Sequence, residues 1–223
     1  MQTLYDAERS PIAKTVAASL YQPFGQGKKF LKDATTDIES QIQKSAIVDL
    51  TNLSRVGFRG ADAATYLNSF GFHLPDAPNF ALQQADGSWV ACLSATEYFL
   101  LGSLIDFGER ISQIENDWTM DDRANYLLPR QDSHAWLQLT GNTVARVMAK
   151  VCAVDLSSEV FAVGQVVQTS VARVNAIVIN VSDAQIQKFN ILCDRAAALY
   201  VWEVLQDAIA EFDGKAVGIE GLL

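Results

Sequence analysis

The sequence has few of the residues that build reactive centres. It contains two histidines and three cysteines, and the cysteines (Cys92, Cys152 and Cys193) are widely spaced, with no C-x-x-C pair. That spacing forms neither a zinc knuckle nor a dithiol redox motif. Each cysteine lies among apolar neighbours, which predicts buried, reduced thiols. We therefore expect no metal site in this chain.

Positive charge is also scarce, and long apolar runs are absent. Lys and Arg total 17 against 26 Asp and Glu, a formal net charge of −9. An acidic chain repels phosphate backbones, so we expect no nucleic-acid partner. No apolar run reaches about eighteen residues, so we expect no membrane span. The first nine residues do not lead from a basic segment into an apolar one, which favours a cytoplasmic protein over a secreted one.

The residues that are present suffice for a folded core. Hydrophobic residues make up 49% of the 223 positions, which permits one large domain or two small, packed halves. Strand and helix patterns begin at Ala46. We expect an irregular N-terminal segment over 1–45, a first α+β half over 46–120, a linker over 121–134, a second α+β half over 135–215, and a C-terminal tail over 216–223.

The two halves repeat one order of elements. In the first, a strand over 55–59 leads to Gly60 and then to a helix whose apolar residues follow helical spacing. In the second, a strand over 135–139 leads to Gly141 and a similar helix. Further strands and a second helix follow in each half. The pattern predicts an α+β fold with two pseudo-duplicated, ferredoxin-like halves, in which Gly60 and Gly141 occupy equivalent places.

Two stretches, residues 129–141 and 168–179, closely resemble the gamma subunits of heterotetrameric sarcosine oxidases, and residues 10–13 and 200–212 also fit. The resemblance implies the fold of the folate-binding domain of glycine-cleavage T-protein. It implies partner alpha, beta and delta subunits that carry FAD, FMN, NAD and tetrahydrofolate. It also implies a supporting role, without catalytic residues or cofactors in this chain, in the oxidative demethylation of sarcosine to glycine.

The resemblance also raises an alternative, a free-standing folate-binding protein of the aminomethyltransferase type. In that case Arg173 and Asn175 are the candidate cofactor-binding residues. Active members of that class have a glycine and an acidic residue after the matching arginine, and this chain has no such pair after Arg173. A folate-binding assembly factor is a third class, but none of the three cysteines lies in the motif of that class. Both departures favour the supporting role.

A dense polar motif lies at the end of the expected linker, where Arg130, Asp132, Ser133 and His134 occur within five positions. Aspartate, serine and histidine are the residue types of a nucleophilic triad. Adjacent side chains point in different directions, however, and cannot align as nucleophile, base and orienting group. We interpret the motif as a hydrogen-bonding element, either within this chain or toward a partner subunit, and the sequence leaves both versions open.

Overall fold

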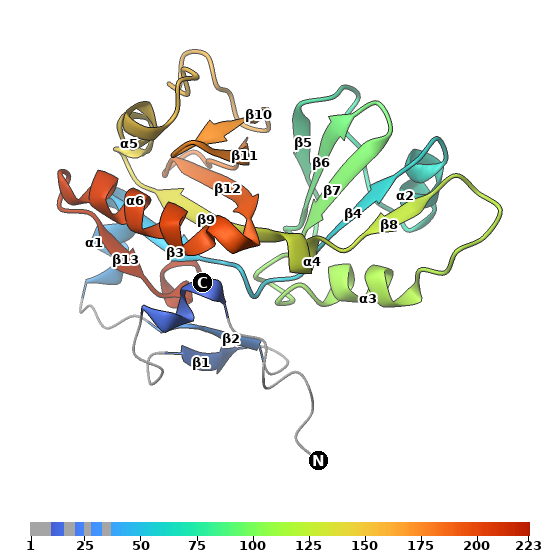
Figure 1. Cartoon of the computed structure of the whole chain (residues 1–223), viewed down its shortest axis with the longest axis horizontal. Helices are drawn as coiled ribbons and strands as arrows, with labels where there is room; N and C mark the ends of the chain where they lie inside the picture. The colour runs from blue at the N-terminus through green and yellow to red at the C-terminus, as the bar shows by residue number, and fades with distance from the viewer. Residues whose placement is uncertain (1–9, 16–20, 25–27, 33–36) are drawn as a thin grey trace. The chain divides into compact units, whose positions relative to one another are not determined.

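A computed structural model describes residues 10–15, 21–24, 28–32 and 37–223 and divides the chain into two compact units (Figure 1). Unit 1 comprises Met1–Asn52, His134–Val163 and Val167–Leu223, whereas unit 2 comprises Leu53–Ser133 and Gly164–Val166. The chain therefore starts in unit 1, builds most of unit 2 as one insertion, and returns to unit 1 at His134. None of the described helices is both long enough and apolar enough to cross a bilayer.

Unit 2 is an antiparallel sheet packed against helices. Its strands are hydrogen-bonded in the order β5-β6-β7-β4-β8. Alternate residues of β4, Val56 and Phe58, join Leu67 of α2 and Ile111 of α3 in one buried cluster, as period-two and helical spacings require. The elements are β4 (Arg55–Arg59), α2 (Ala63–Ser69), β5 (Phe80–Gln83), β6 (Trp89–Ser94), β7 (Glu97–Leu101), α3 (Glu109–Asp117), β8 (Tyr126–Leu128) and α4 (Arg130–Ser133).

Unit 1 has a larger sheet in the order β10-β11-β12-β9-β3-β13 and a separate β1-β2 hairpin. Trp202 and Val201 of α6 and Met148 of α5 are buried in its core. The elements are η2 (Pro11–Lys14), β1 (Tyr21–Phe24), β2 (Lys28–Leu31), α1 (Ile38–Lys44), β3 (Ala46–Asp49), β9 (His134–Thr140), α5 (Val144–Val151), β10 (Val166–Val171), β11 (Val174–Asn180), β12 (Lys188–Asp194), η4 (Arg195–Ala197), α6 (Ala198–Ala210), β13 (Lys215–Val217) and η5 (Ile219–Leu222).

The predicted repetition is confirmed by the strand order. Unit 2 runs β4-α2-β5-β6-β7-α3-β8, and unit 1 runs β9-α5-β10-β11-β12-α6-β13. The order β6-β7-β4-β8, with a helix after β4 and another after β7, is the ferredoxin-like arrangement with β5 added at one edge. Unit 1 has the same arrangement, with β3 inserted between β9 and β13. The α+β fold class is therefore confirmed.

The two glycines that mark the repeat are required by close backbone contacts. Gly60 follows β4 and Gly141 follows β9, the first strands of the two repeats, with φ angles of 143° and 107°. A Cβ on Gly60 would lie 1.9 Å from the carbonyl oxygen of Ala124, and one on Gly141 would lie 2.6 Å from the carbonyl of Lys44. Both positions therefore combine a backbone conformation that favours glycine with a space that excludes a side chain.

Several expected boundaries differ from those of the structure. The strand at Ala46–Asp49 does not open the first half but pairs with β9 and β13 in unit 1. Its four residues are all buried, and such a pattern predicts a buried strand without indicating its partner. The expected linker contains β8, which extends the sheet of unit 2, and the expected tail contains most of β13. The described parts of residues 10–45 contain more regular structure than expected, whereas residues 1–9, 16–20, 25–27 and 33–36 lie outside the described residues.

Candidate functional site

Arg130, the first residue of the polar motif of residues 130–134, belongs to an ion-pair cluster in unit 2. Arg130, at the start of α4, donates to one carboxylate oxygen of Glu97, and Arg59 donates to the other, with an Nε to Oε2 distance of 2.9 Å. The side chain of Glu97 is 9% exposed and that of Arg130 is 16% exposed. Burial is the main influence on the Arg130 guanidinium and lowers its pKa, although Glu97 opposes the shift. The cluster is therefore an internal attachment of α4 to the sheet.

The sheet is shaped to receive Arg130. A Cβ on Gly57 of β4 would lie 2.8 Å from Nε of Arg130, so a larger residue there would displace the Arg130 side chain. The guanidinium carbon also lies 5.2 Å from the ring centroid of Phe99, which pairs with Gly57 across the sheet. This distance is within the range of cation–π attraction. Gly57 is thus part of the same attachment.

A second attachment involves Gln131, the amide residue within the motif. Arg55 is fully buried and donates to the backbone oxygens of Leu53 and Gln131, at 2.9 and 3.1 Å. The Oε1 of Gln131 accepts from the Arg55 backbone N–H and from its guanidinium, both at 3.3 Å. A buried guanidinium needs such acceptors because its N–H groups would otherwise be desolvated without compensation. Residues 130 and 131 therefore fix α4 through two neighbouring arginine contacts.

The rest of the motif does not join this cluster. Asp132 is exposed, and the hydroxyl of Ser133 donates to the Pro129 carbonyl at 3.2 Å, which closes a local turn. His134 belongs to unit 1, where it begins β9. The motif is thus two short pieces of different units. The contacts of Arg130 in this structure lie within the chain, which is the internal version of the hypothesis.

His134 and Asn175 do come together, at a pocket in unit 1. The pocket has a volume of about 340 Å³. It is lined by His134, Gln168, Thr169, Asn175, Ala176, Ile177 and Leu192. Arg173 is not among these residues. It is exposed in the two-residue turn between β10 and β11, where Ala172 and Arg173 have φ angles of 51° and 65°. Positive φ at both central residues is the geometry of a tight hairpin turn, so Arg173 serves as a turn residue.

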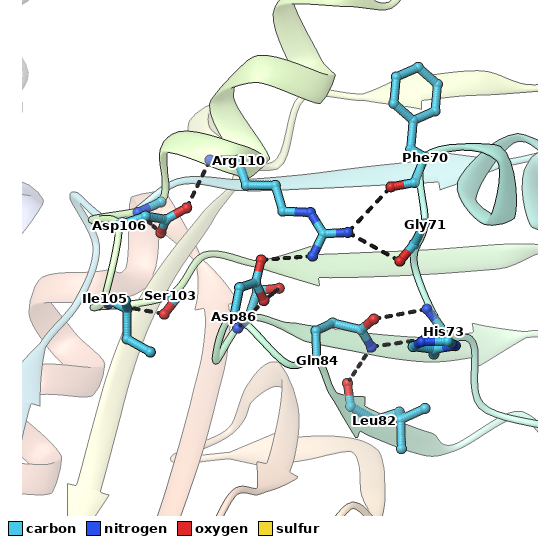
Figure 2. Close-up of polar contacts among 12 residues, drawn as sticks. Phe70, Gly71, His73, Leu82, Gln84, Asp86, Ser103, Ile105, Asp106 and Arg110 are labelled. Atoms are coloured by element: carbon cyan, nitrogen blue, oxygen red, sulfur yellow. Dashed lines mark hydrogen bonds and ion pairs between the residues drawn. The ribbon is translucent and has the colours of Figure 1, made fainter.

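An arginine that the sequence analysis did not consider is the centre of a larger network in unit 2 (Figure 2). Arg110 of α3 donates to Asp86 at 2.7 Å and to the backbone oxygens of Phe70 and Gly71 at 3.3 and 3.2 Å. Its guanidinium carbon lies 3.9 Å from the ring centroid of Phe72. One side chain therefore connects α3 to Asp86, in the turn between β5 and β6, and to the segment that follows α2.

The electrostatics of Asp86 follow from this contact. Burial raises the pKa of the Asp86 carboxyl, but hydrogen bonds from Arg110 and Ser88 outweigh burial, and the net shift is downward. Next to it, Gln84 fixes the loop that contains His73 (Figure 2). The Gln84 side chain accepts from the His73 backbone N–H at 2.8 Å and donates to the His73 carbonyl at 2.9 Å. No local sequence signal indicates these contacts, because they join residues 11 to 40 positions apart.

The three cysteines are buried and free, as their apolar neighbours predicted. Within the described parts of the chain, no group of three or more His, Cys, Asp or Glu side chains could hold a metal ion. The described polar contacts instead attach segments of unit 2 to one another through Arg130, Arg55 and Arg110. The described residues also line two pockets, one in each unit.

The fold, an α+β arrangement with two ferredoxin-like units, is shared with two solved structures. Aminomethyltransferase T of the glycine cleavage system from Bartonella henselae is 12% identical, with a TM-score of 0.67 over 95% of this chain. The chain spans 59% of that protein. Heterotetrameric sarcosine oxidase from Corynebacterium sp. U-96, in complex with pyrrole 2-carboxylate, is 20% identical, with a TM-score of 0.63 over 93% of this chain and 97% of that one. At these identities the likeness shows the fold alone.

The family is shown by sequence. The model of the sarcosine oxidase gamma subunit family matches residues 61–211, which include parts of both units. This chain belongs to the sarcosine oxidase gamma subunit family. A comparison with curated proteins gave no significant match.

Proposed function

We propose that this chain is the gamma subunit of a heterotetrameric sarcosine oxidase and supports, as a structural subunit, the oxidative demethylation of sarcosine to glycine. The observation that carries the proposal is the family match over residues 61–211. The likeness to a heterotetrameric sarcosine oxidase over nearly the whole length of both chains is consistent with it. This match favours the gamma-subunit reading over the free-standing aminomethyltransferase alternative.

The proposal includes partner alpha, beta and delta subunits, which would hold FAD, FMN, NAD and tetrahydrofolate. When bound to those subunits, the flavins would accept electrons from sarcosine and tetrahydrofolate would accept the one-carbon unit. The role of this chain would be to bury surface on a partner and keep that partner in position. An interface of standard size buries about 800 Å² on each side, which a folded chain of this length can provide.

The described lining of the unit 1 pocket lacks the acidic group expected of a tetrahydrofolate site. The pocket that contains His134 and Asn175 has imidazole, amide, hydroxyl and apolar groups among its described lining residues, but no carboxylate. A pterin ring offers N–H donors that a carboxylate accepts, so an acidic group is the expected partner. Arg173, the other candidate, is a turn residue outside this lining. We therefore derive no step through folate in this chain.

The experiment that tests the proposal is co-purification. The chain carrying an affinity tag is expressed with the alpha, beta and delta subunits, and we expect all of them in one complex that oxidises sarcosine. The purified chain alone should show no flavin absorbance and no sarcosine oxidation, and should bind a tetrahydrofolate analogue weakly or not at all in calorimetry. A chain that fails to co-purify, or one that releases peroxide from sarcosine by itself, contradicts the proposal.

A further inference from the structure

A second pocket, of about 420 Å³, lies in unit 2 between the end of α2 and helix α3. Its deepest residues, Phe72 and Ile114, are each 3% exposed, so the floor is apolar. The rim contains Phe70, which is 42% exposed, and the outward face of α3. The described lining residues are Phe70, Phe72, Asp106, Glu109, Arg110, Gln113, Ile114 and Asp117.

The charge of this pocket is negative. Arg110 is the cation among its described lining residues, and the ion pair with Asp86 at 2.7 Å already neutralises it (Figure 2). The carboxylates of Asp106, Glu109 and Asp117 remain. Asp106 accepts backbone N–H groups of Gly108 and Arg110, and Asp117 accepts the amide of Gln113 at 2.8 Å. Neutral donors orient these carboxylates without cancelling their charge. The pocket therefore attracts a cation.

Exposed polar residues, two of them acidic, lie along one face of α3. Glu109, Gln113 and Asp117 are exposed and follow one another at intervals of four residues, so they form one stripe on the helix. Across the pocket, Phe70 lies against Tyr66, with the ring centroids 4.9 Å apart. Figure 2 shows the Phe70 ring directed away from the Arg110 guanidinium, so that arginine does not cover it. An exposed aromatic ring beside carboxylates attracts a cation through its face.

The chemistry of a basic side chain matches these features together. Arg and Lys have an apolar stem, which suits the side of the floor near Ile114, since Arg110 already covers one face of the Phe72 ring, and a cationic end, which suits the stripe of α3. A bare metal ion would require a cluster of ligands, and none occurs among the described residues of the chain. An anionic ligand would be repelled. Arginine is also enriched at the buried centres of protein interfaces, where it packs with aromatic residues.

We propose that this acidic pocket, which we call the α3 pocket, receives an arginine or lysine side chain from a partner subunit of the complex. The inference rests on the proposed function, because it needs a complex in which this chain is a subunit. Charge complementarity and the exposed Phe70 ring identify the chemistry of the partner segment. A second copy of this chain is the other occupant that the test must separate.

The test uses the tagged full chain co-expressed with the other subunits. Glu109→Lys combined with Asp117→Lys should lower the amount of partner subunits that co-purify by about tenfold or more, because two reversed charges would face the incoming cation. Phe70→Ala should lower it by a smaller factor. The matched control is Glu203→Lys combined with Asp207→Lys on α6, which makes the same change in net charge at two exposed positions of unit 1. The control should assemble normally, and all variants should melt at the temperature of the wild type.

The outcomes separate the two proposals. Normal assembly of the α3 variant contradicts the α3 pocket and leaves the proposed function intact. Equal loss in the α3 variant and its control also contradicts it, because the effect would then be one of net charge. If the α3 variant instead abolishes self-association of the isolated chain and assembles normally with partners, a second copy is the occupant and the inference is wrong. A wild-type chain that does not co-purify contradicts the proposed function itself. Should the α3 variant unfold, Phe70→Ala alone decides, and normal assembly of that variant would overturn the inference.

Discussion

Units 1 and 2 have the same order of elements, yet equivalent positions in their sheets have different chemistry. We call Gly60 and Gly141 the marker glycines. Three residues before its marker glycine, unit 2 has Gly57 opposite Phe99, whereas unit 1 has Gln138 opposite Asn190. In unit 2 the missing side chain admits Arg130. In unit 1 the two amides bond to each other, with Gln138 Nε2 donating to Asn190 Oδ1 at 2.8 Å.

The position next to the marker glycine differs in the same way. In unit 2 Arg59 pairs with Glu97, and in unit 1 Thr140 pairs with Lys188. At these places unit 2 has a nearly buried carboxylate contacted by two arginines, whereas unit 1 has two neutral amides, a hydroxyl and a lysine. The comparison teaches that the shared fold depends on backbone geometry, chiefly the two glycines, while the side chains on the sheet are free to serve different contacts.

The largest effect should come from the marker glycines. Gly60→Ala should destabilise the chain by about 4 kcal/mol, since its Cβ would lie 1.9 Å from a backbone oxygen, and Gly141→Ala should cost somewhat less, because its nearest atoms are 2.6 Å away. Gly71→Ala is the control. It also has a positive φ, but the nearest atom is 4.0 Å away, so we expect about 1 kcal/mol. Urea denaturation measures all three, and equal losses in Gly60→Ala and Gly71→Ala would show that the close contact is unimportant.

The next effect tests the ion-pair cluster of unit 2. Glu97→Ala should cost about 3 kcal/mol, because Arg130 would remain largely buried without its carboxylate. Arg130→Ala should cost about half as much, since Arg59 still pairs with Glu97. The double variant should lose less than the sum of the single losses. A larger loss in Arg130→Ala than in Glu97→Ala would contradict this order.

The matching effect in unit 1 should be smaller. Gln138→Ala removes the amide that donates to Asn190, and an unpaired buried oxygen costs about 2 kcal/mol. Replacing both residues with leucine should recover part of this loss, because no polar group is then left buried without a partner. Thermal and urea unfolding of the single and double variants provide the comparison. A double variant that is less stable than Gln138→Ala would indicate that the amides have a role beyond their mutual bond.

The smallest effect is the pH dependence of the Asp86–Arg110 contact. Because the net pKa of Asp86 is lowered in the folded chain, its stabilising contribution is present above the unfolded pKa near 3.8 and is lost as pH falls through the folded pKa. Asp86→Asn should therefore reduce stability by about 1 kcal/mol at neutral pH and by less near pH 3. Unfolding curves at the two pH values measure the difference. An equal loss of stability at both would show that the charge of Asp86 does not stabilise the fold.

Local patterns predicted much of this fold, but they did not predict which strands pair with each other. Helical spacing indicated α2, α5 and α6, and glycine after a strand indicated the two equivalent turns. The partner of Ala46–Asp49 could not be predicted, because a fully buried strand has no sequence feature that names its neighbour. The order of elements repeats in both halves. The insertion of β3 into the sheet of unit 1, however, depends on pairing with strands that are far away in the sequence.

The candidate site was predicted less well than the fold. The motif of residues 130–134 was found by its density of polar groups, yet Gln131, which contacts Arg55, was not singled out. Arg110 was missed because its partners, Asp86 and the backbone of Phe70 and Gly71, are 24 to 40 residues away. Such contacts depend on how α3 packs in unit 2, and no spacing in the sequence encodes that.

The central claim is that this chain contributes surface to a complex and no reacting group. It is tested most directly by adding purified chain to a complex assembled without it and measuring sarcosine oxidation. We expect activity to rise until the chain is equimolar with the complex. A variant with His134, Arg173 and Asn175 all replaced by alanine should restore activity to the same level, because none of these residues takes part in the reaction. Loss of turnover in that variant, with assembly and melting temperature unchanged, would contradict the claim.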